Sequence, residues 1–215
     1  MTGLQTRIIP AEGLEIRAEQ EGKEKRISGY GIVYDKETRL YSDLYEVIRP
    51  GAASKVLAGN PDIKCALNHD RRYLFGRTKS KTLTLTEDKK GVRYEAIPPD
   101  AQWARDAIAS IERGDIDGSS FTFAVEPEHE KITKRKDGSY LREIIEISRI
   151  GEMGPVTDPA YMDTTAEARA KAEYESLTAR LRTQDEADEI AETKRTLDLR
   201  RKRLNLKAKS QGGIS

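Results

Sequence analysis

Two hydroxyl side chains open a strand-like segment at Gly118-Ser119-Ser120-Phe121-Thr122-Phe123, where a turn leads into alternating residues. Earlier in the chain, His69 ends the apolar run Ile63-Lys64-Cys65-Ala66-Leu67-Asn68, and only one other histidine occurs in the 215 residues. Serine is a poor nucleophile unless a base within ~2.6–3.2 Å takes its proton, and histidine is the usual base. A histidine at one strand end and a serine on a later strand therefore predict serine-based hydrolysis, such as that of a serine protease.

Composition argues against several other classes of protein. Charged residues make up 35% of the chain and hydrophobic residues 36%, so the core is modest and part of the length lies outside it. The net charge of +1 argues against a specific nucleic-acid partner. No apolar stretch reaches the ~18 residues of a membrane helix, and Met1 to Gln5 lacks a signal-peptide core, so no membrane partner is predicted. The single cysteine excludes an intrachain disulfide framework and fits a reducing cytosol.

Short β-like runs, separated by turn residues, fill the middle of the chain. Strands are predicted at 27–34, 44–48, 63–68, 82–86, 92–97 and 119–125, with a hairpin from Glu130–Lys134 to Tyr140–Ile147. Helices are predicted at 52–57 and 101–113, the second with Asp100 as N-cap and Gly114 as its left-handed end. Many strands and few helices predict an α+β fold, mainly β, as a mixed, mainly antiparallel barrel or sandwich.

The composition changes beyond Asp163. From Thr164 to Lys209 the chain has no proline or glycine, and apolar residues recur at helical spacing, with Ile190, Leu197 and Leu204 seven residues apart. This pattern predicts a long helix with a thin apolar stripe. Four basic residues, Arg200 to Arg203, are interpreted as a solvated face, with a docking tail for an acidic partner as the alternative. The end of this segment, from Gln211, is predicted to be disordered.

Several blocks of sequence occur in a fixed order: Gly29–Tyr34, Glu46–Ala52, Asn68–Asp70, Phe75–Thr78, Arg113–Ile116, Gly118–Phe123 and the segment from Glu152 to Tyr161. Together they resemble the prohead (capsid maturation) protease family of tailed phages, which is similar in fold to the herpesvirus assemblin proteases. The resemblance implies a herpesvirus-protease-like β-barrel with surrounding helices. It divides the chain into an N-terminal arm (1–24), a protease domain (25–165) and a charged helical tail (166–215).

The resemblance also assigns roles to residues. The family's serine block has the form Gly-x-Ser-Phe-Gly-Phe, so the nucleophile is expected at Ser120, with Ser119 as the competing hydroxyl on the opposite face. The base is expected at His69, because His129 lies in a charged stretch that is typical of an exposed loop. Thr122 departs from the family's second glycine.

The third catalytic residue is expected from the resemblance at Glu152, where Met153-Gly154 departs from the family's commoner Val-Ser. Other carboxylates remain candidates for this role, namely Glu143, Glu146 and Asp158, whereas Asp70 is interpreted as a loop residue. The Gly151–Gly154 segment is expected to be a loop that supplies oxyanion donors. Cys65 is interpreted as a buried, inert thiol. No metal-ligand spacing and no phosphate loop occur, so no metal and no cofactor are predicted.

The predicted function is that of a serine endopeptidase of phage prohead maturation. By resemblance, it acts in the host cytoplasm inside the assembling procapsid, and its substrates are the scaffolding protein or the scaffold segment of the major capsid protein, and its own tail. The assemblin relatives self-associate, so the resemblance also admits self-association. Two alternatives stay open: a non-enzymatic scaffold or capsid-assembly factor, suggested by the charged tail, and an amidase or esterase that uses the same residues.

Overall fold

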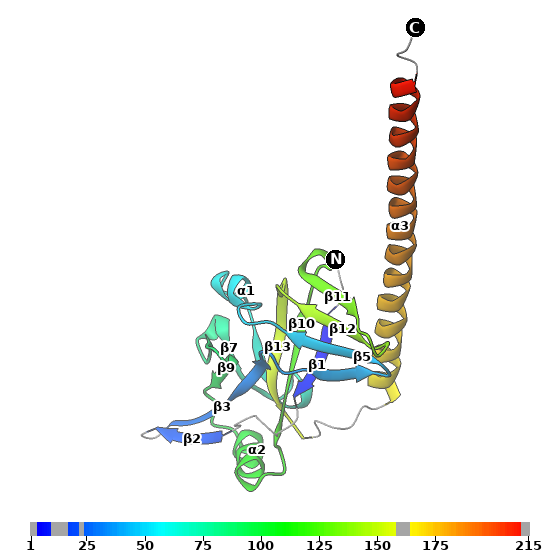
Figure 1. The fold of residues 1–215 in the computed structure, drawn as a ribbon. Coiled ribbons are helices and arrows are strands. Elements are labelled where there is room, and N and C mark those ends of the chain that lie inside the picture. Colours follow the sequence, from blue (N-terminus) through cyan, green and yellow to red (C-terminus); the bar gives the residue numbers. More distant parts are fainter. Residues whose placement is uncertain (1–3, 10–16, 22–23, 158–163, 212–215) are drawn as a thin grey trace. The chain divides into compact units, whose positions relative to one another are not determined.

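Three β-sheets form most of the first of two units in the chain (Figure 1). A computed structural model describes residues 4–9, 17–21, 24–157 and 164–211, and divides into units of residues 1–163 and 164–215. The five-stranded sheet has the order β1 (Gln5–Ile9), β10 (Gly118–Ala124), β13 (Arg149–Val156), β6 (Lys64–Ala66) and β7 (Leu74–Arg77). A four-stranded sheet comprises β11 (Glu130–Lys134), β12 (Tyr140–Ile144), β5 (Leu44–Ile48) and β4 (Thr38–Tyr41). The other consists of β2 (Arg17–Glu21), β3 (Glu24–Val33), β9 (Gly91–Ala96) and β8 (Leu83–Glu87).

The predicted α+β class with mainly strands is confirmed, but the predicted closed barrel is wrong. Each sheet keeps two edge strands among the described residues, and two pairings, β13 with β6 and β12 with β5, are parallel. Helices were expected to surround the barrel. The described part of this unit contains two, α1 (Ser54–Ala58) and α2 (Gln102–Arg113), together with three short 3₁₀ turns. Alternation along a strand fixes one buried face, and open packed sheets satisfy that requirement as well as a barrel does.

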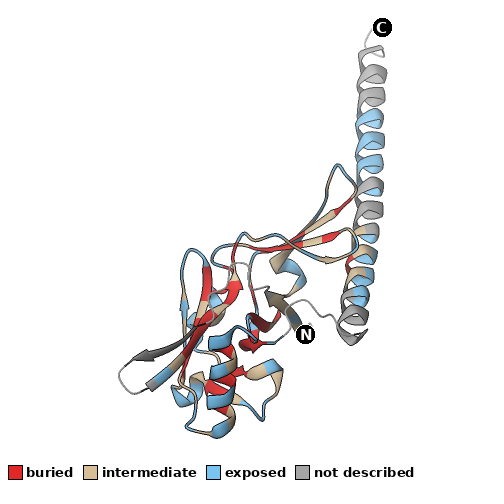
Figure 2. Ribbon diagram, turned by 90° about the horizontal axis from the view of Figure 1, so that it is seen from below, coloured by how far each residue is buried: buried red, intermediate tan, exposed pale blue. Residues whose placement is uncertain are grey.

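The core includes buried residues from all three sheets (Figure 2). Its fully buried members include Ile27, Ile32, Phe75, Tyr94, Phe121, Phe123, Ile144 and Met153. Helix α2 adds one face, through Ala104, Ile108 and Ile111, and ends at Gly114, whose φ of 88° is left-handed. The predicted N-cap is wrong, because Ala101 occupies that position and the Asp100 carboxylate pairs with Arg105 instead.

Several segments of the first unit depart from the predicted elements, and two of them matter for the site. Residues 5–9, assigned from sequence to an N-terminal arm, form β1 and pair antiparallel with β10. The strand predicted at 63–68 shortens to Lys64–Ala66, and a 3₁₀ turn (Leu67–His69) follows it. Both differences bear on the candidate active site, because β1 lies beside Ser120 and the turn carries His69.

The second unit contains a single long helix among its described residues, α3 (Thr164–Gln211). Ile190 and Leu197, which belong to the predicted apolar stripe, are exposed. None of the helices in the described ranges is both long and apolar enough to span a membrane. The predicted disorder at the end of the chain concerns residues that mostly lie outside the described ranges.

Gly76 of β7 offers a test of how tightly the first unit packs. A Cβ atom there would overlap the carbonyl oxygen of Thr82 and lie 3.3 Å from the Ala96 Cβ. We expect Gly76→Ala to lower the free energy of unfolding by about 1–3 kcal/mol, because the obstacle is backbone and cannot rotate away. Gly59→Ala is the matched control, since its Cβ would meet nothing closer than the Val56 carbonyl oxygen at 3.4 Å, and it should change stability by less than ~1 kcal/mol. Urea unfolding followed by circular dichroism measures both, and equal stabilities would contradict the tight approach of β7.

Candidate active site

Strand β10 separates the two neighbouring serines onto opposite faces. The Ser119 Oγ lies 3.4 Å from the Tyr94 hydroxyl and 3.4 Å from the Gly154 carbonyl oxygen, inside the core. The Ser120 Oγ lies 2.6 Å from the His69 Nε2. Successive residues of a strand point to opposite sides, so only one of the two hydroxyls can reach this histidine.

His69 stands in a left-handed turn rather than on a strand. Asn68 and His69 have φ values of 51° and 59°, and the side-chain oxygen of Asn68 accepts a hydrogen bond of 2.9 Å from the Thr157 backbone N–H. Asparagine tolerates left-handed backbone better than most residues, and this bond ties the turn to the end of β13. The imidazole is 31% exposed, so one side of it faces solvent.

Glu152 lies on β13, opposite Thr122 of β10 and Lys64 of β6. Its Oε1 is 3.4 Å from the His69 Nδ1, and its side chain is 6% exposed. The Oε2 lies 3.8 Å from the Arg71 Nε, and Oε1 has no hydrogen-bond partner among the described residues. The structure therefore brings Ser120, His69 and Glu152 together in that order, with the imidazole between hydroxyl and carboxylate.

The other candidate residues pair elsewhere. His129 lies 3.6 Å from Glu146, and Glu146 also accepts from Lys55 at 2.8 Å. Two further carboxylates have arginine partners: Glu143 pairs with Arg49 at 2.5 Å, and Asp70 pairs with Arg72 at 2.6 Å. Asp158 lies outside the described residues.

The prediction that Gly151–Gly154 forms a loop with oxyanion donors is wrong. These residues lie inside β13, which pairs with β10 on one side and with β6 on the other. The glycine at 154 serves close packing, because a Cβ there would lie 2.6 Å from the Ala66 carbonyl oxygen.

Cys65 on β6 is fully buried. Burial raises the pKa of its thiol, and the negative charge of Glu152 raises that pKa further. The described residues contain no group of three or more side chains suited to hold a metal ion.

Strand β1 is the part of the site that sequence reasoning missed. Ile8 lies opposite Ser120 in the strand register, and the Ser120 Oγ is 2.9 Å from the Arg7 carbonyl oxygen. The Arg7 guanidinium forms a two-point ion pair with Glu46 of β5. No local signal marks these contacts, because they join residues 113 and 39 positions apart in the chain.

Comparison with known proteins identifies the family. The family described as Caudovirus prohead serine protease matches residues 12–178. The chain belongs to this family. Its role is therefore that of a phage protease of capsid maturation, and the resemblance found in the ordered sequence blocks is confirmed.

One solved structure similar to the chain is that of the bacteriophage T4 capsid assembly protease, gp21. The similarity has a TM-score of 0.44 at 11% sequence identity, and it covers 71% of this chain and 96% of that one. No curated protein matches the chain significantly.

The Cys65 thiol can be tested directly. Only the thiolate is a nucleophile, and a raised pKa keeps the thiol protonated at pH 8. We expect Ellman's reagent to detect almost no thiol in the native chain at pH 8. After unfolding in about 6 M guanidinium chloride, it should detect about one thiol per chain. Rapid stoichiometric reaction of the native chain would contradict the burial of this thiol and would make Cys65 a candidate nucleophile.

Proposed function

We propose that the chain is a serine endopeptidase in which Ser120 is the nucleophile, His69 the general base and Glu152 the carboxylate that orients the base. The observation that carries this proposal is the 2.6 Å separation of the Ser120 Oγ and the His69 Nε2. It lies within the range in which an imidazole can take a hydroxyl proton during attack. Family membership supports the reaction class, because the family is one of serine proteases.

The mechanism follows from the order of the three side chains. The Ser120 Oγ attacks the carbonyl carbon of the scissile peptide bond while His69 takes the hydroxyl proton. His69 then gives that proton to the leaving amine as the C–N bond breaks, which leaves an acyl group on Ser120. A water molecule, deprotonated by the same imidazole, hydrolyses the acyl-enzyme and restores the hydroxyl.

Glu152 acts through the histidine. The carboxylate is nearly buried, and its closest contact with the imidazole is the 3.4 Å approach of Oε1 to Nδ1. A negative charge in this position favours the tautomer with hydrogen on Nδ1 and stabilises the imidazolium formed during attack. A small shift of the His69 side chain, which is partly exposed, would bring Nδ1 from 3.4 Å into hydrogen-bond distance of Oε1.

In the phage, we place this activity in the host cytoplasm, inside the assembling procapsid. The substrates are the scaffolding protein or the scaffold segment of the major capsid protein, and the chain's own tail. The charged tail, 166–215, either directs packaging into the prohead or is removed by cleavage. Confinement raises the effective concentration of substrate, so few enzyme copies suffice per capsid.

A second candidate function is that of a non-enzymatic capsid-assembly factor. The feature that favours it is α3, a helix rich in charge whose apolar residues Ile190 and Leu197 are exposed. Exposed apolar positions at heptad spacing suit a helical partner. Substitution of the proposed nucleophile separates the two candidates, because an assembly factor does not need that hydroxyl.

Removal of the nucleophile or the base tests the proposal. We expect Ser120→Ala and His69→Ala each to lower kcat for cleavage of a scaffold polypeptide by about 10⁴–10⁶-fold, because attack then lacks either the hydroxyl or its proton acceptor. The matched controls are Ser119→Ala and His129→Ala, which remove the same groups from positions outside the site. The controls should stay within about tenfold of the parent chain. Normal cleavage of the polypeptide by both Ser120→Ala and His69→Ala would contradict the proposal that the chain is a serine endopeptidase.

The role of Glu152 has its own test. We expect Glu152→Gln to lower kcat by about 10²–10⁴-fold with KM within about threefold, because an amide can neither fix the tautomer nor stabilise the imidazolium. Glu152→Asp should recover part of this loss, and thermal unfolding should show that all three forms are folded. An unchanged kcat in folded Glu152→Gln would assign the third position to another group.

A further inference from the structure

Strand β1 covers the proposed nucleophile. Ser120 is 0% exposed, and β1 is the edge strand that lies alongside it in the five-stranded sheet. β1 pairs only with β10, so its other edge has no strand among the described residues. An extended peptide could reach Ser120 by adding to the edge of β10, and β1 occupies that edge.

The contact with β1 also affects the chemistry of Ser120. Its Oγ lies 2.6 Å from the His69 Nε2 and 2.9 Å from the Arg7 carbonyl oxygen. A hydroxyl has one hydrogen to donate, so it cannot give that hydrogen to both acceptors at once. While the Arg7 carbonyl holds this hydrogen, His69 cannot take it. The Arg7 carbonyl is thus the backbone carbonyl that lies against the Ser120 hydroxyl in this structure.

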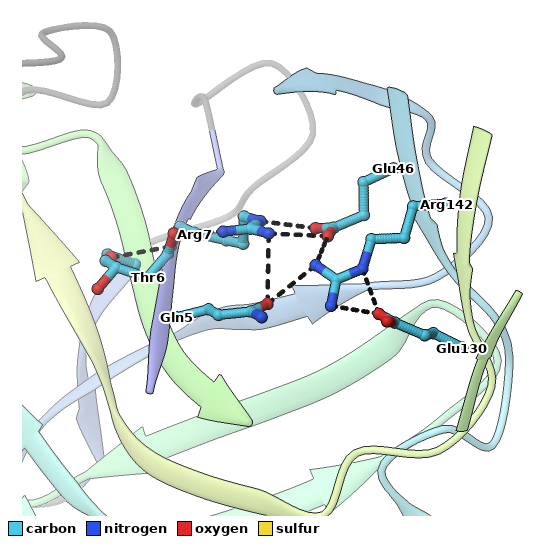
Figure 3. Close-up of polar contacts among 7 residues, drawn as sticks. Gln5, Thr6, Arg7, Glu46, Glu130 and Arg142 are labelled. Atoms are coloured by element: carbon cyan, nitrogen blue, oxygen red, sulfur yellow. Dashed lines mark hydrogen bonds and ion pairs between the residues drawn. The ribbon is translucent and has the colours of Figure 1, made fainter. Parts of the chain in front are cut away.

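The Arg7 side chain is held by Glu46, as Figure 3 shows. Its Nε donates to Glu46 Oε1 at 2.7 Å, and a terminal nitrogen donates to Oε2 at 2.8 Å. Glu46 also accepts from Arg142 at 2.8 Å, and Arg142 pairs with Glu130 at 2.5 Å. A two-point contact of this kind matches the planar fork of a guanidinium and discriminates against the point charge of a lysine.

A cavity of about 40 Å³ adjoins this ion pair. Its lining includes Arg7 and Ile8 of β1, Glu46 and Ile48 of β5, Phe121 of β10, and Lys36. Glu46 thus lines the same space as the two residues of β1 nearest to Ser120.

The charges around Glu46 bear on which side chain suits this site. Arg7 and Arg142 are its guanidinium partners, and Arg142 also pairs with Glu130, so loss of Arg7 leaves Glu46 with one guanidinium shared between two carboxylates. Burial raises the pKa of Glu46, but the charges of Arg7 and Arg142 outweigh this effect and leave the pKa below its usual value. Glu46 is thus ionised at neutral pH, and a buried carboxylate that loses one of its guanidinium partners favours another cation.

We propose that Glu46 determines substrate specificity by binding an arginine side chain of the substrate, and that Arg7 occupies this position in the present structure. This inference rests on the proposed function. The preferred substrate is an extended segment with arginine immediately before the scissile bond, which replaces β1 at the edge of β10. The arginine carbonyl then faces Ser120, and the C–N bond that follows it breaks by the mechanism given above.

Cleavage of matched peptides by the full-length chain tests this specificity. The probe is an internally quenched peptide with the sequence of residues 4–9, and its arginine is replaced in turn by lysine, glutamine and glutamate. We expect kcat/KM to fall by about tenfold for lysine and about a hundredfold for glutamine, as for loss of the fork geometry or of a buried charge pair. In Glu46→Gln the ratio of arginine to glutamine peptides should collapse to within about threefold.

The ratio is measured within one enzyme preparation, so partial misfolding cancels. Glu143→Gln is the matched control, because it removes a carboxylate that pairs with Arg49 and not with Arg7, and its ratio should equal that of the parent chain. A serine-directed fluorophosphonate reports separately on the nucleophile. Labelling or cleavage that depends on Ser120, without preference for arginine, would overturn the specificity alone. Absence of both in the parent chain and in Arg7→Gln would overturn the proposed function as well.

Occupancy by β1 has a separate readout. Arg7→Gln weakens the hold of β1 without touching the proposed triad, so fluorophosphonate labelling of Ser120 should accelerate by roughly tenfold. Thr6→Ala is the control on the same strand, since that side chain is exposed, and it should leave the labelling rate unchanged. Equal rates for the parent chain and Arg7→Gln would show that Arg7 does not hold β1 over the nucleophile.

Discussion

Strand β13 pairs along both of its edges, and the geometry of the candidate active site depends on this double pairing. Its antiparallel partner β10 carries Ser120, and its parallel partner β6 leads into the turn that carries His69. Glu152 on β13 itself lies between the two. Three residues far apart in sequence are thus placed by backbone hydrogen bonds of one sheet, which are more rigid than loop contacts. The missing side chain at Gly154 lets β6 approach closely enough for this arrangement.

Local patterns in the sequence predicted several strands and helices of the fold, and long-range pairings account for what they missed. The strand at Leu44–Ile48, the hairpin at 130–144 and the left-handed end of α2 at Gly114 all follow from alternation and turn residues, and the structure has them. Strand β1 gave no such signal, because its place is fixed by partners more than a hundred residues away. Local patterns also could not predict whether the sheets close into a barrel. The alternation along a strand specifies which face is buried, but not which strand lies beside it. At the site, the turn at Asn68 replaced an expected strand end because asparagine accepts a left-handed backbone.

The buried charges beside β1 are difficult to explain by stability. Arg142 is 1% exposed and Glu46 is 4% exposed, so both lose nearly all contact with water. Replacing such a pair by apolar residues of similar size is often neutral or stabilising, whereas removing one partner costs about 3–5 kcal/mol. Stability alone therefore gives little reason to build this network next to a proposed nucleophile. Recognition of a basic side chain does give one, because it needs a carboxylate that is held rigidly and shielded from water.

An edge strand over the proposed nucleophile would link recognition to control. An uncovered edge at β10 would present unpaired backbone groups to any extended segment, which is a hazard that native sheets avoid by covering their edges. β1 covers this edge, and it is held by backbone pairing to β10 and by the ion pair of Arg7 with Glu46. A substrate that supplies both an extended backbone and an arginine replaces each of these contacts with an equivalent one, so the exchange costs little beyond the ordering of the segment. In the scheme proposed above, the high local concentration of substrate inside a procapsid favours this exchange by mass action, and outside it the intramolecular strand prevails.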